Sequence, residues 1–181
     1  MEKPNRKTVR LPGYDYGSPG YYFITICTKD KQNLLCKISE PPVGTVALDG
    51  PLVQLSDYGK IVENQLESFR SYYSNIKITS YVIMPNHVHL LLYIPPDFDC
   101  GPSRATVPTG AAETMSAPKV STVGRFIGTI KRFCNREIGR NVWQSRSHDE
   151  IIKNESHLYG VEDYIAANPS KWLEDEHYVA D

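Results

Sequence analysis

The sequence has no long apolar stretch, and this excludes a helix that spans a membrane. Its most apolar stretch, Val88–Ile94, has seven residues, whereas a spanning helix needs roughly 20. Residues 1–10 are polar and lack the apolar core of a secretory signal peptide. We therefore expect a soluble, cytoplasmic protein that makes no contact with a membrane.

Cysteines at metal-binding spacing are also missing. Cys27, Cys36, Cys100 and Cys134 lie far apart, with no Cys-x-x-Cys pair, so neither a disulfide framework nor a cysteine zinc site is indicated. The composition, with 40% hydrophobic and 23% charged residues, excludes collagen-like, coiled-coil and wholly disordered chains. A chain of 181 residues can bury one full core, and we expect a single domain over residues 1–181.

The sequence has no marked excess of charge of either sign. Twenty basic and 21 acidic residues leave a formal net charge of −1, which argues against non-specific binding to a polyanion. Acidic residues gather around 174–176. The basic residues gather in two other segments, namely Lys3, Arg6, Lys7 and Arg10 and then Arg125, Lys131, Arg132, Arg136 and Arg140. Local basic surfaces can bind phosphates whatever the total charge.

Side-chain periodicity predicts strands and helices in mixed order. The expected strands are 21–28, 34–38, 43–48, 76–84 and 87–94, and the expected helices are 56–73, 123–138, 156–168 and 169–175. Pro85-Asn86 separates two of the strands and predicts a hairpin. Gly139 is placed to end the second helix.

This order is typical of an α+β fold. We expect a ferredoxin-like, mostly antiparallel sheet with helices packed on one face. Residues 95–118 contain five prolines and follow neither the helical nor the strand period. They are predicted to form a flexible insertion outside the core.

The most distinctive motif is His87-Val88-His89. Side chains of a strand alternate between its two faces, so both imidazoles project to one side and Val88 to the other. Two neutral imidazoles side by side supply half of a divalent-metal site. An isolated His-x-His is more often a pair of surface histidines, and the spacing alone leaves both interpretations open.

A second pair of polar residues lies on the predicted helix 156–168. Tyr164 and Asn168 are four residues apart and therefore share a helix face. The amide oxygen of Asn168 can bind a metal, and the phenol of Tyr164 can act as a nucleophile. Asn168 before Pro169 equally fits a helix N-cap, and Tyr164 fits a packed aromatic residue, so these two residues alone do not decide.

Several motifs follow one another along nearly the whole chain. They are Gly13-Tyr14-Asp15-Tyr16, the strand 21–28, Met84-Pro85-Asn86-His87-Val88-His89, Trp143-Gln144, Ile151-Ile152-Lys153-Asn154-Glu155 and Tyr164-Ile165-Ala166-Ala167-Asn168-Pro169. In this order they resemble the REP-associated tyrosine transposases, which are insertion-sequence-200-like, single-tyrosine HUH transposases. Residues 95–118 fall outside the resemblance.

The resemblance implies a bacterial, metal-dependent enzyme that cuts and rejoins single-stranded DNA at hairpin ends through a 5′-phosphotyrosine. Carried over by motif, His87 and His89 bind the metal, Tyr164 is the nucleophile and Asn168 supplies a third polar ligand. The family further implies a homodimer with a ferredoxin-like core. Imidazole and oxygen ligands suit magnesium or manganese.

The basic residues give a route for DNA binding. We expect the later basic segment (Arg125, Lys131, Arg132, Arg136 and Arg140) to follow a sugar-phosphate backbone, and the earlier one (Lys3, Arg6, Lys7 and Arg10) to form a mobile arm. A solvated helix face is the alternative for the later segment. Two other functions stay open. One is a catalytically inactive, element-derived protein that binds palindromic DNA repeats, and the other is a ferredoxin-like RNA-binding module whose histidines are incidental.

Overall fold

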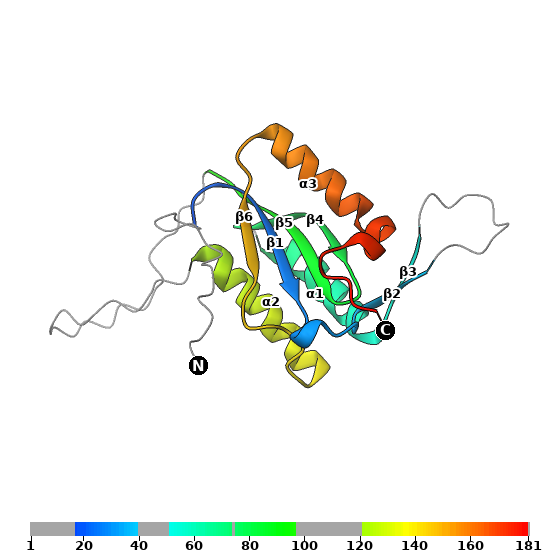
Figure 1. Ribbon diagram of the computed structural model, residues 1–181. Coiled ribbons are helices and arrows are strands. Elements are labelled where there is room, and N and C mark those ends of the chain that lie inside the picture. The colour runs from blue at the N-terminus through cyan, green and yellow to red at the C-terminus, as the bar shows by residue number, and fades with distance from the viewer. Residues whose placement is uncertain (1–16, 40–50, 74, 97–120, 181) are drawn as a thin grey trace, which may run out of the picture.

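A computed structural model describes residues 17–39, 51–73, 75–96 and 121–180, arranged as a sheet with helices on both faces (Figure 1). The strands are β1 (Gly20–Cys27), β2 (Cys36–Ser39), β3 (Leu52–Leu55), β4 (Lys77–Ile83), β5 (His87–Ile94) and β6 (His148–Ile151). The helices are α1 (Asp57–Tyr72), α2 (Thr122–Ile138) and α3 (Glu155–Ala167), with short 3₁₀ helices η1 (Lys29–Lys31) and η2 (Asn168–Glu174).

The main sheet has the strand order β4-β5-β1-β6, and all neighbouring strands are antiparallel. Its strands and their connecting helices follow the chain as β1, α1, β4, β5, α2 and β6, which is the β-α-β-β-α-β order of ferredoxin-like folds. Strands β2 and β3 pair with each other between β1 and α1. The expected α+β class with an antiparallel sheet is therefore confirmed.

The helices do not all pack on one face, and that part of the expectation is wrong. One core joins α1 and α2 to inward side chains of β1 and β5 such as Ile24 and Leu90, and a second core joins Phe23 and Leu91 to Val161 and Ile165 of α3. The two central strands are apolar on both faces here, so each face needs a cover. Helix α3 provides the second cover.

The ends of α1 and α2 are set by local capping residues, of which Gly139 was predicted from the sequence. The Ser56 hydroxyl accepts from the N–H of Gly59 at 3.1 Å, at the start of α1, and Ser121 caps α2 in the same way. Gly139 ends α2 in the left-handed conformation, with φ of 81°. The predicted strand 43–48 and most of the predicted insertion 95–118 lie outside the described residues.

Two further expectations concern cysteines and membranes. Cys27, Cys36 and Cys134 are free thiols. Of the helices in the described part of the chain, none combines the length and the apolar character that crossing a bilayer requires.

The first turn of α1 makes a close backbone approach that we expect only glycine to allow. A Cβ added to Gly59 would lie 2.0 Å from the carbonyl oxygen of Leu35, an oxygen that also accepts from the N–H and the hydroxyl of Ser56. Gly59→Ala should therefore lower the free energy of unfolding by about 1–3 kcal/mol, because the backbone must shift.

Gly128→Ala is the matched control, because a Cβ at this α2 position meets open space. It should raise the free energy of unfolding by about 0.5–1 kcal/mol, through helix propensity. Urea denaturation of both variants measures the difference. A Gly59→Ala protein as stable as the Gly128→Ala protein would contradict this account of the contact.

Candidate metal centre

The histidine pair lies inside the protein, beneath α3. Strand alternation turns His87 and His89 toward α3, while Val88 and Leu90 enter the core on the α1 and α2 side. His87 is 0% exposed and His89 is 2% exposed, which excludes the interpretation as surface histidines. Their Nε2 atoms are 3.0 Å apart, so the two rings converge on one point.

This spacing fits a shared metal ion. Two ligand atoms that each lie about 2.1 Å from one ion, at a right angle, are about 3.0 Å apart. A third group is Asp175, whose carboxylate oxygen lies 3.9 Å from Nε2 of His87, with its side chain 3% exposed. The ligand atoms of His87, His89 and Asp175 all lie within 4.8 Å of one another. These three residues could hold a divalent cation.

Burial keeps both imidazoles neutral. It lowers the pKa of His87 to about 2, and the neighbouring His89 acts in the same direction. Burial also lowers the pKa of His89 to about 4, although the charge of Asp175 opposes the change. A neutral imidazole has the free lone pair that a metal needs. Neither ring therefore carries a positive charge that would repel a cation at neutral pH.

Helix α3 brings Tyr164 to the edge of this centre. Its hydroxyl lies 3.4 Å from Nε2 of His89 and donates to Oδ2 of Asp175 at 3.5 Å. The ring meets Phe23 edge to face, with centroids 5.9 Å apart. Partial burial, and secondly the charge of Asp175, raise the pKa of the phenol. Tyr164 is therefore protonated at neutral pH and needs a base before it can attack.

Asn168 lies beside the same carboxylate. It is 2% exposed, and its Nδ2 donates to Oδ2 of Asp175 at 3.4 Å. Its Oδ1 is buried and has no hydrogen-bond partner among the described residues. A buried carbonyl oxygen without a donor is rare in proteins, and a cation beside Asp175 would satisfy it. Asn168, the sequence-predicted ligand, therefore lies beside Asp175, the third residue of this group.

Asp175 is not among the site residues predicted from the sequence, where it is only one of the acidic residues that gather around 174–176. In the structure η2 turns the chain back after Pro169 and places Asp175 against the histidines. The N–H of His177 then donates to its Oδ1 at 2.6 Å. The proline after Asn168 signals a change of direction, but no local pattern shows where the chain returns.

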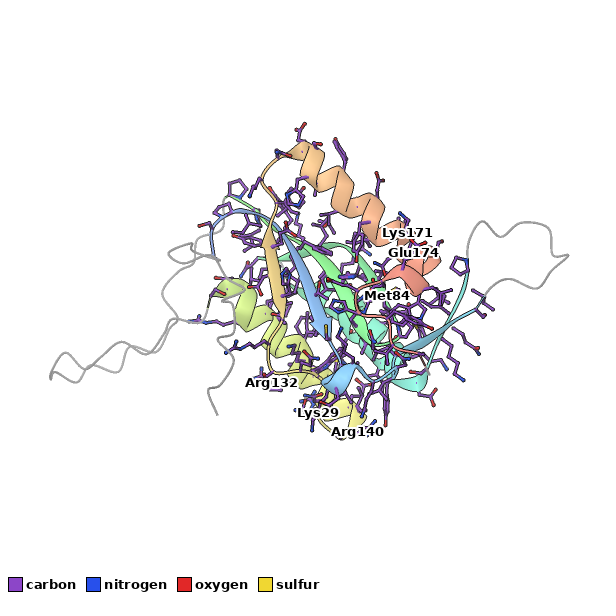
Figure 2. The ribbon with its side chains drawn as sticks, viewed as in Figure 1. Lys29, Met84, Arg132, Arg140, Lys171 and Glu174 are labelled. Carbon is purple, nitrogen blue, oxygen red and sulfur yellow. The ribbon has the colours of Figure 1, made fainter. Side chains whose placement is uncertain are left out.

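The basic residues of α2 lie on the other face of the sheet from the histidines. Arg125, Arg132, Arg136 and Arg140 are exposed, and the guanidinium of Arg136 lies 4.6 Å from the centre of the Phe133 ring. Figure 2 places Arg132 and Arg140 by α2, far from Lys171 and Glu174 of η2. These four arginines are exposed, but they do not adjoin the candidate metal centre.

Lys131 differs from these arginines. Its ammonium group donates to the carbonyls of Gln144 and Arg146 at 2.9 and 3.0 Å. Burial lowers its pKa to about 8. This lysine fastens the loop before β6 to α2, instead of presenting its charge to a partner. The early basic residues Lys3, Arg6, Lys7 and Arg10 lie outside the described residues.

Two solved structures are similar to this chain in fold. A solved structure of a REP-associated tyrosine transposase bound to a REP hairpin covers 90% of this chain and 73% of its own, with a TM-score of 0.55 and 18% identity. The chain shares the fold of that transposase. It is also similar to a crystal structure of a candidate transposase from Deinococcus radiodurans R1, which covers 87% of this chain and 95% of its own (TM-score 0.43, 15% identity).

A relative by sequence matches nearly the whole chain. An uncharacterised protein of Haemophilus influenzae (strain ATCC 51907 / DSM 11121 / KW20 / Rd) is 29% identical over 182 residues, covering 97% of this chain and 94% of the relative. No protein-family model matches this chain.

Stability of the metal-free protein should fall as the pH drops from about 6.5 toward 4. The folded pKa values of His87 and His89 lie below the ordinary value near 6.5, so the unfolded chain binds protons first. Each histidine adds at most about 1.4 kcal/mol per pH unit to the slope. Urea unfolding in EDTA, at pH steps between 7.5 and 5, measures this slope.

The double variant His87→Gln/His89→Gln should have a flatter slope than the wild type, because its two buried groups no longer titrate. The burial of His177 also lowers its pKa, so some slope should remain. Identical slopes in the two proteins would show that the buried pair is not held neutral.

Proposed function

We propose that this protein is a metal-dependent enzyme that cleaves and rejoins single-stranded DNA at hairpin ends, with Tyr164 as nucleophile. The observation that carries the proposal is the position of the Tyr164 hydroxyl, 3.4 Å from Nε2 of His89, at the edge of a buried, neutral histidine pair. The shared fold with a transposase that was solved with a REP hairpin supports this choice of substrate.

Four side chains form the proposed metal site. His87 and His89 contribute nitrogen, and Asp175 and the unpartnered Oδ1 of Asn168 contribute oxygen. This mixture of imidazole and oxygen suits magnesium or manganese. When bound, the ion supplies Lewis acidity and orientation to a DNA phosphate.

Tyr164 performs the covalent step. Its phenolic oxygen forms a bond to the phosphorus, and the bond from phosphorus to the 3′ oxygen breaks, which leaves a 5′-phosphotyrosine and a 3′-hydroxyl. Oδ2 of Asp175, at 3.5 Å, is placed to accept the phenolic proton, and the departing 3′ oxygen takes a proton from water. Attack by a 3′-hydroxyl reverses the step, so rejoining needs no ATP.

DNA affinity is assigned to the exposed arginines Arg125, Arg132 and Arg136 of α2 and Arg140 just after its C-cap. Guanidinium groups bind phosphates without reading sequence, and the distance of this surface from the metal centre suits a hairpin stem. Lys131 is left out of this set because its ammonium group binds backbone carbonyls. The early basic residues Lys3, Arg6, Lys7 and Arg10 complete the proposal as an additional arm.

One chain contributes all the groups of the proposed site. Tyr164 faces His89 of its own chain, so a first cleavage does not require side chains from a second copy. A homodimer is proposed for the later stage, in which two DNA ends are exchanged.

The activity should appear as a covalent adduct between protein and DNA. With a 3′-labelled single-stranded hairpin and Mn²⁺, the wild-type protein should form a species that resists denaturation. EDTA should abolish it, because the phosphate is then neither oriented nor polarised. Tyr164→Phe should abolish the adduct and leave hairpin affinity within a few-fold of wild type, because only the attacking oxygen is removed.

Tyr159→Phe is the matched control, since Tyr159 is an exposed tyrosine of the same helix, and it should keep the full adduct. Hairpin binding without an adduct, over a panel of candidate repeats, would instead support the inactive, repeat-binding protein. A preference for RNA with no dependence on metal would support the RNA-binding module.

A further inference from the structure

A chain of hydrogen bonds behind the histidine pair starts at two backbone carbonyls. Asn86 is 0% exposed, and its Nδ2 donates to the carbonyls of His177 and Lys31 at 2.8 and 3.3 Å. Carbonyls only accept, so the amide NH₂ must face them and Oδ1 must face the other way. Oδ1 lies 2.9 Å from Nδ1 of His87. His87 therefore carries its proton on Nδ1 and a lone pair on Nε2.

The same reasoning extends to the second histidine. The Nε2 lone pair of His87 lies 3.0 Å from Nε2 of His89, and a buried acceptor needs a donor. In the metal-free protein, His89 therefore carries its proton on Nε2. Its Nδ1 is then an acceptor, and the hydroxyl of Thr25 donates a hydrogen bond to it at 3.0 Å. Each link in this chain is fixed by the link before it.

The backbone at Lys31, whose carbonyl accepts from the Asn86 amide, is itself held in an unfavourable conformation. Asp30 and Lys31 have φ of 56° and 53°, in the left-handed region that side chains other than glycine rarely adopt. Strained residues of this kind persist where the surrounding structure requires them. Here the strained turn presents the Lys31 carbonyl to Asn86.

The two histidines are consequently unequal partners for a metal. Nε2 of His87 already presents a lone pair to the position where a metal would bind both histidines, whereas Nε2 of His89 presents a proton to it. For His89 to bind, that proton must pass to solvent and Nδ1 must take one from solvent. Thr25 then has to turn from donor to acceptor. The imidazole gains and loses one proton, so its charge is unchanged.

We propose that Asn86 is a positioning residue that holds His87 in the metal-binding tautomer, and that Thr25 allows His89 to exchange its tautomer when a divalent cation binds. The proposal rests on the metal site of the proposed function but not on DNA cleavage. A protein that binds Mn²⁺ and forms no DNA adduct would refute the activity and leave this proposal intact.

Imidazole ¹H–¹⁵N correlation spectra at pH 7.5 test the tautomers directly. In the metal-free wild type, His87 should be protonated on Nδ1 and His89 on Nε2. Addition of Zn²⁺, used as a diamagnetic probe, should move the proton of His89 to Nδ1 and leave that of His87 in place. A proton on Nε2 of His87 without metal, or no change at His89 with Zn²⁺, would overturn the proposal.

Asn86→Ala tests the positioning role through affinity. Loss of the acceptor for Nδ1 of His87 should weaken Mn²⁺ binding about tenfold or more, the usual effect of removing such a partner. It should also release the tautomer preference of His87. Mn²⁺ binding is measured by electron paramagnetic resonance on protein that retains the wild-type near-ultraviolet circular dichroism.

Asn135→Ala is the matched control. Asn135 also uses both ends of its amide, accepting from the N–H of Val142 at 3.0 Å and donating to Asn141 at 3.1 Å, but on α2. This variant should lose stability and keep wild-type Mn²⁺ affinity and tautomers. If Asn86→Ala binds Mn²⁺ within twofold of wild type, or if both variants weaken binding equally, Asn86 has only a structural role. The wild-type spectra decide the tautomers even if Asn86→Ala does not fold.

Discussion

Strand β5 is covered by helices on both faces, so its side chains must pack in two layers, and the candidate site depends on this constraint. Val88 and Leu90 fix the strand in the core beneath α1 and α2, and the alternation of a strand then turns His87 and His89 into the other layer. Because β5 is hydrogen-bonded to β4 on one side and β1 on the other, the backbone of neither histidine can shift without breaking the sheet, and hydrogen bonds to Asn86 and Thr25 hold the two rings. The convergence of the two Nε2 atoms is therefore a property of the backbone and not of a flexible loop.

The burial that suits the histidines works against the tyrosine. Removing water lowers the pKa of His87 and His89 and so keeps both rings neutral, yet the same loss of water raises the pKa of Tyr164. A neutral ligand and an ionised nucleophile thus need opposite environments. The position of Tyr164 at the edge of the centre, 41% exposed, is a compromise between them. In the proposed function the bound cation supplies the stabilisation that burial and the charge of Asp175 withhold from a phenolate, and Asp175 accepts the phenolic proton.

Local patterns in the sequence predicted the features that local interactions determine, namely the positions of two helices and the strand face of the two histidines. Helical spacing and the caps at Ser56 and Gly139 located α1 and α2, and alternation placed both histidines on one face. The position of α3 was not predicted, because the strand face that it covers carries His87 and His89 and so resembles a solvent face. Asp175 was not predicted, because its position depends on how the chain returns to the sheet after η2. That return is a tertiary contact, and no periodic pattern in the sequence indicates it. Tyr164 and Asn168 were identified through a family resemblance, and no spacing rule would have joined them to β5.

The separation between the arginines and the metal centre has an electrostatic consequence for the proposed function. Around the centre the histidines are neutral, and the charges that act on them include the carboxylates of Asp175 and Glu176 and the ammonium group of Lys31. The two negative charges outweigh the positive one and disfavour a DNA phosphate as long as no cation is bound. A divalent ion reverses the sign of this local charge. The arginines of α2, on the far face of the sheet, can bind a stem in either case, and they govern the salt dependence of affinity. Metal loading therefore controls the entry of the scissile phosphate rather than the capture of the DNA.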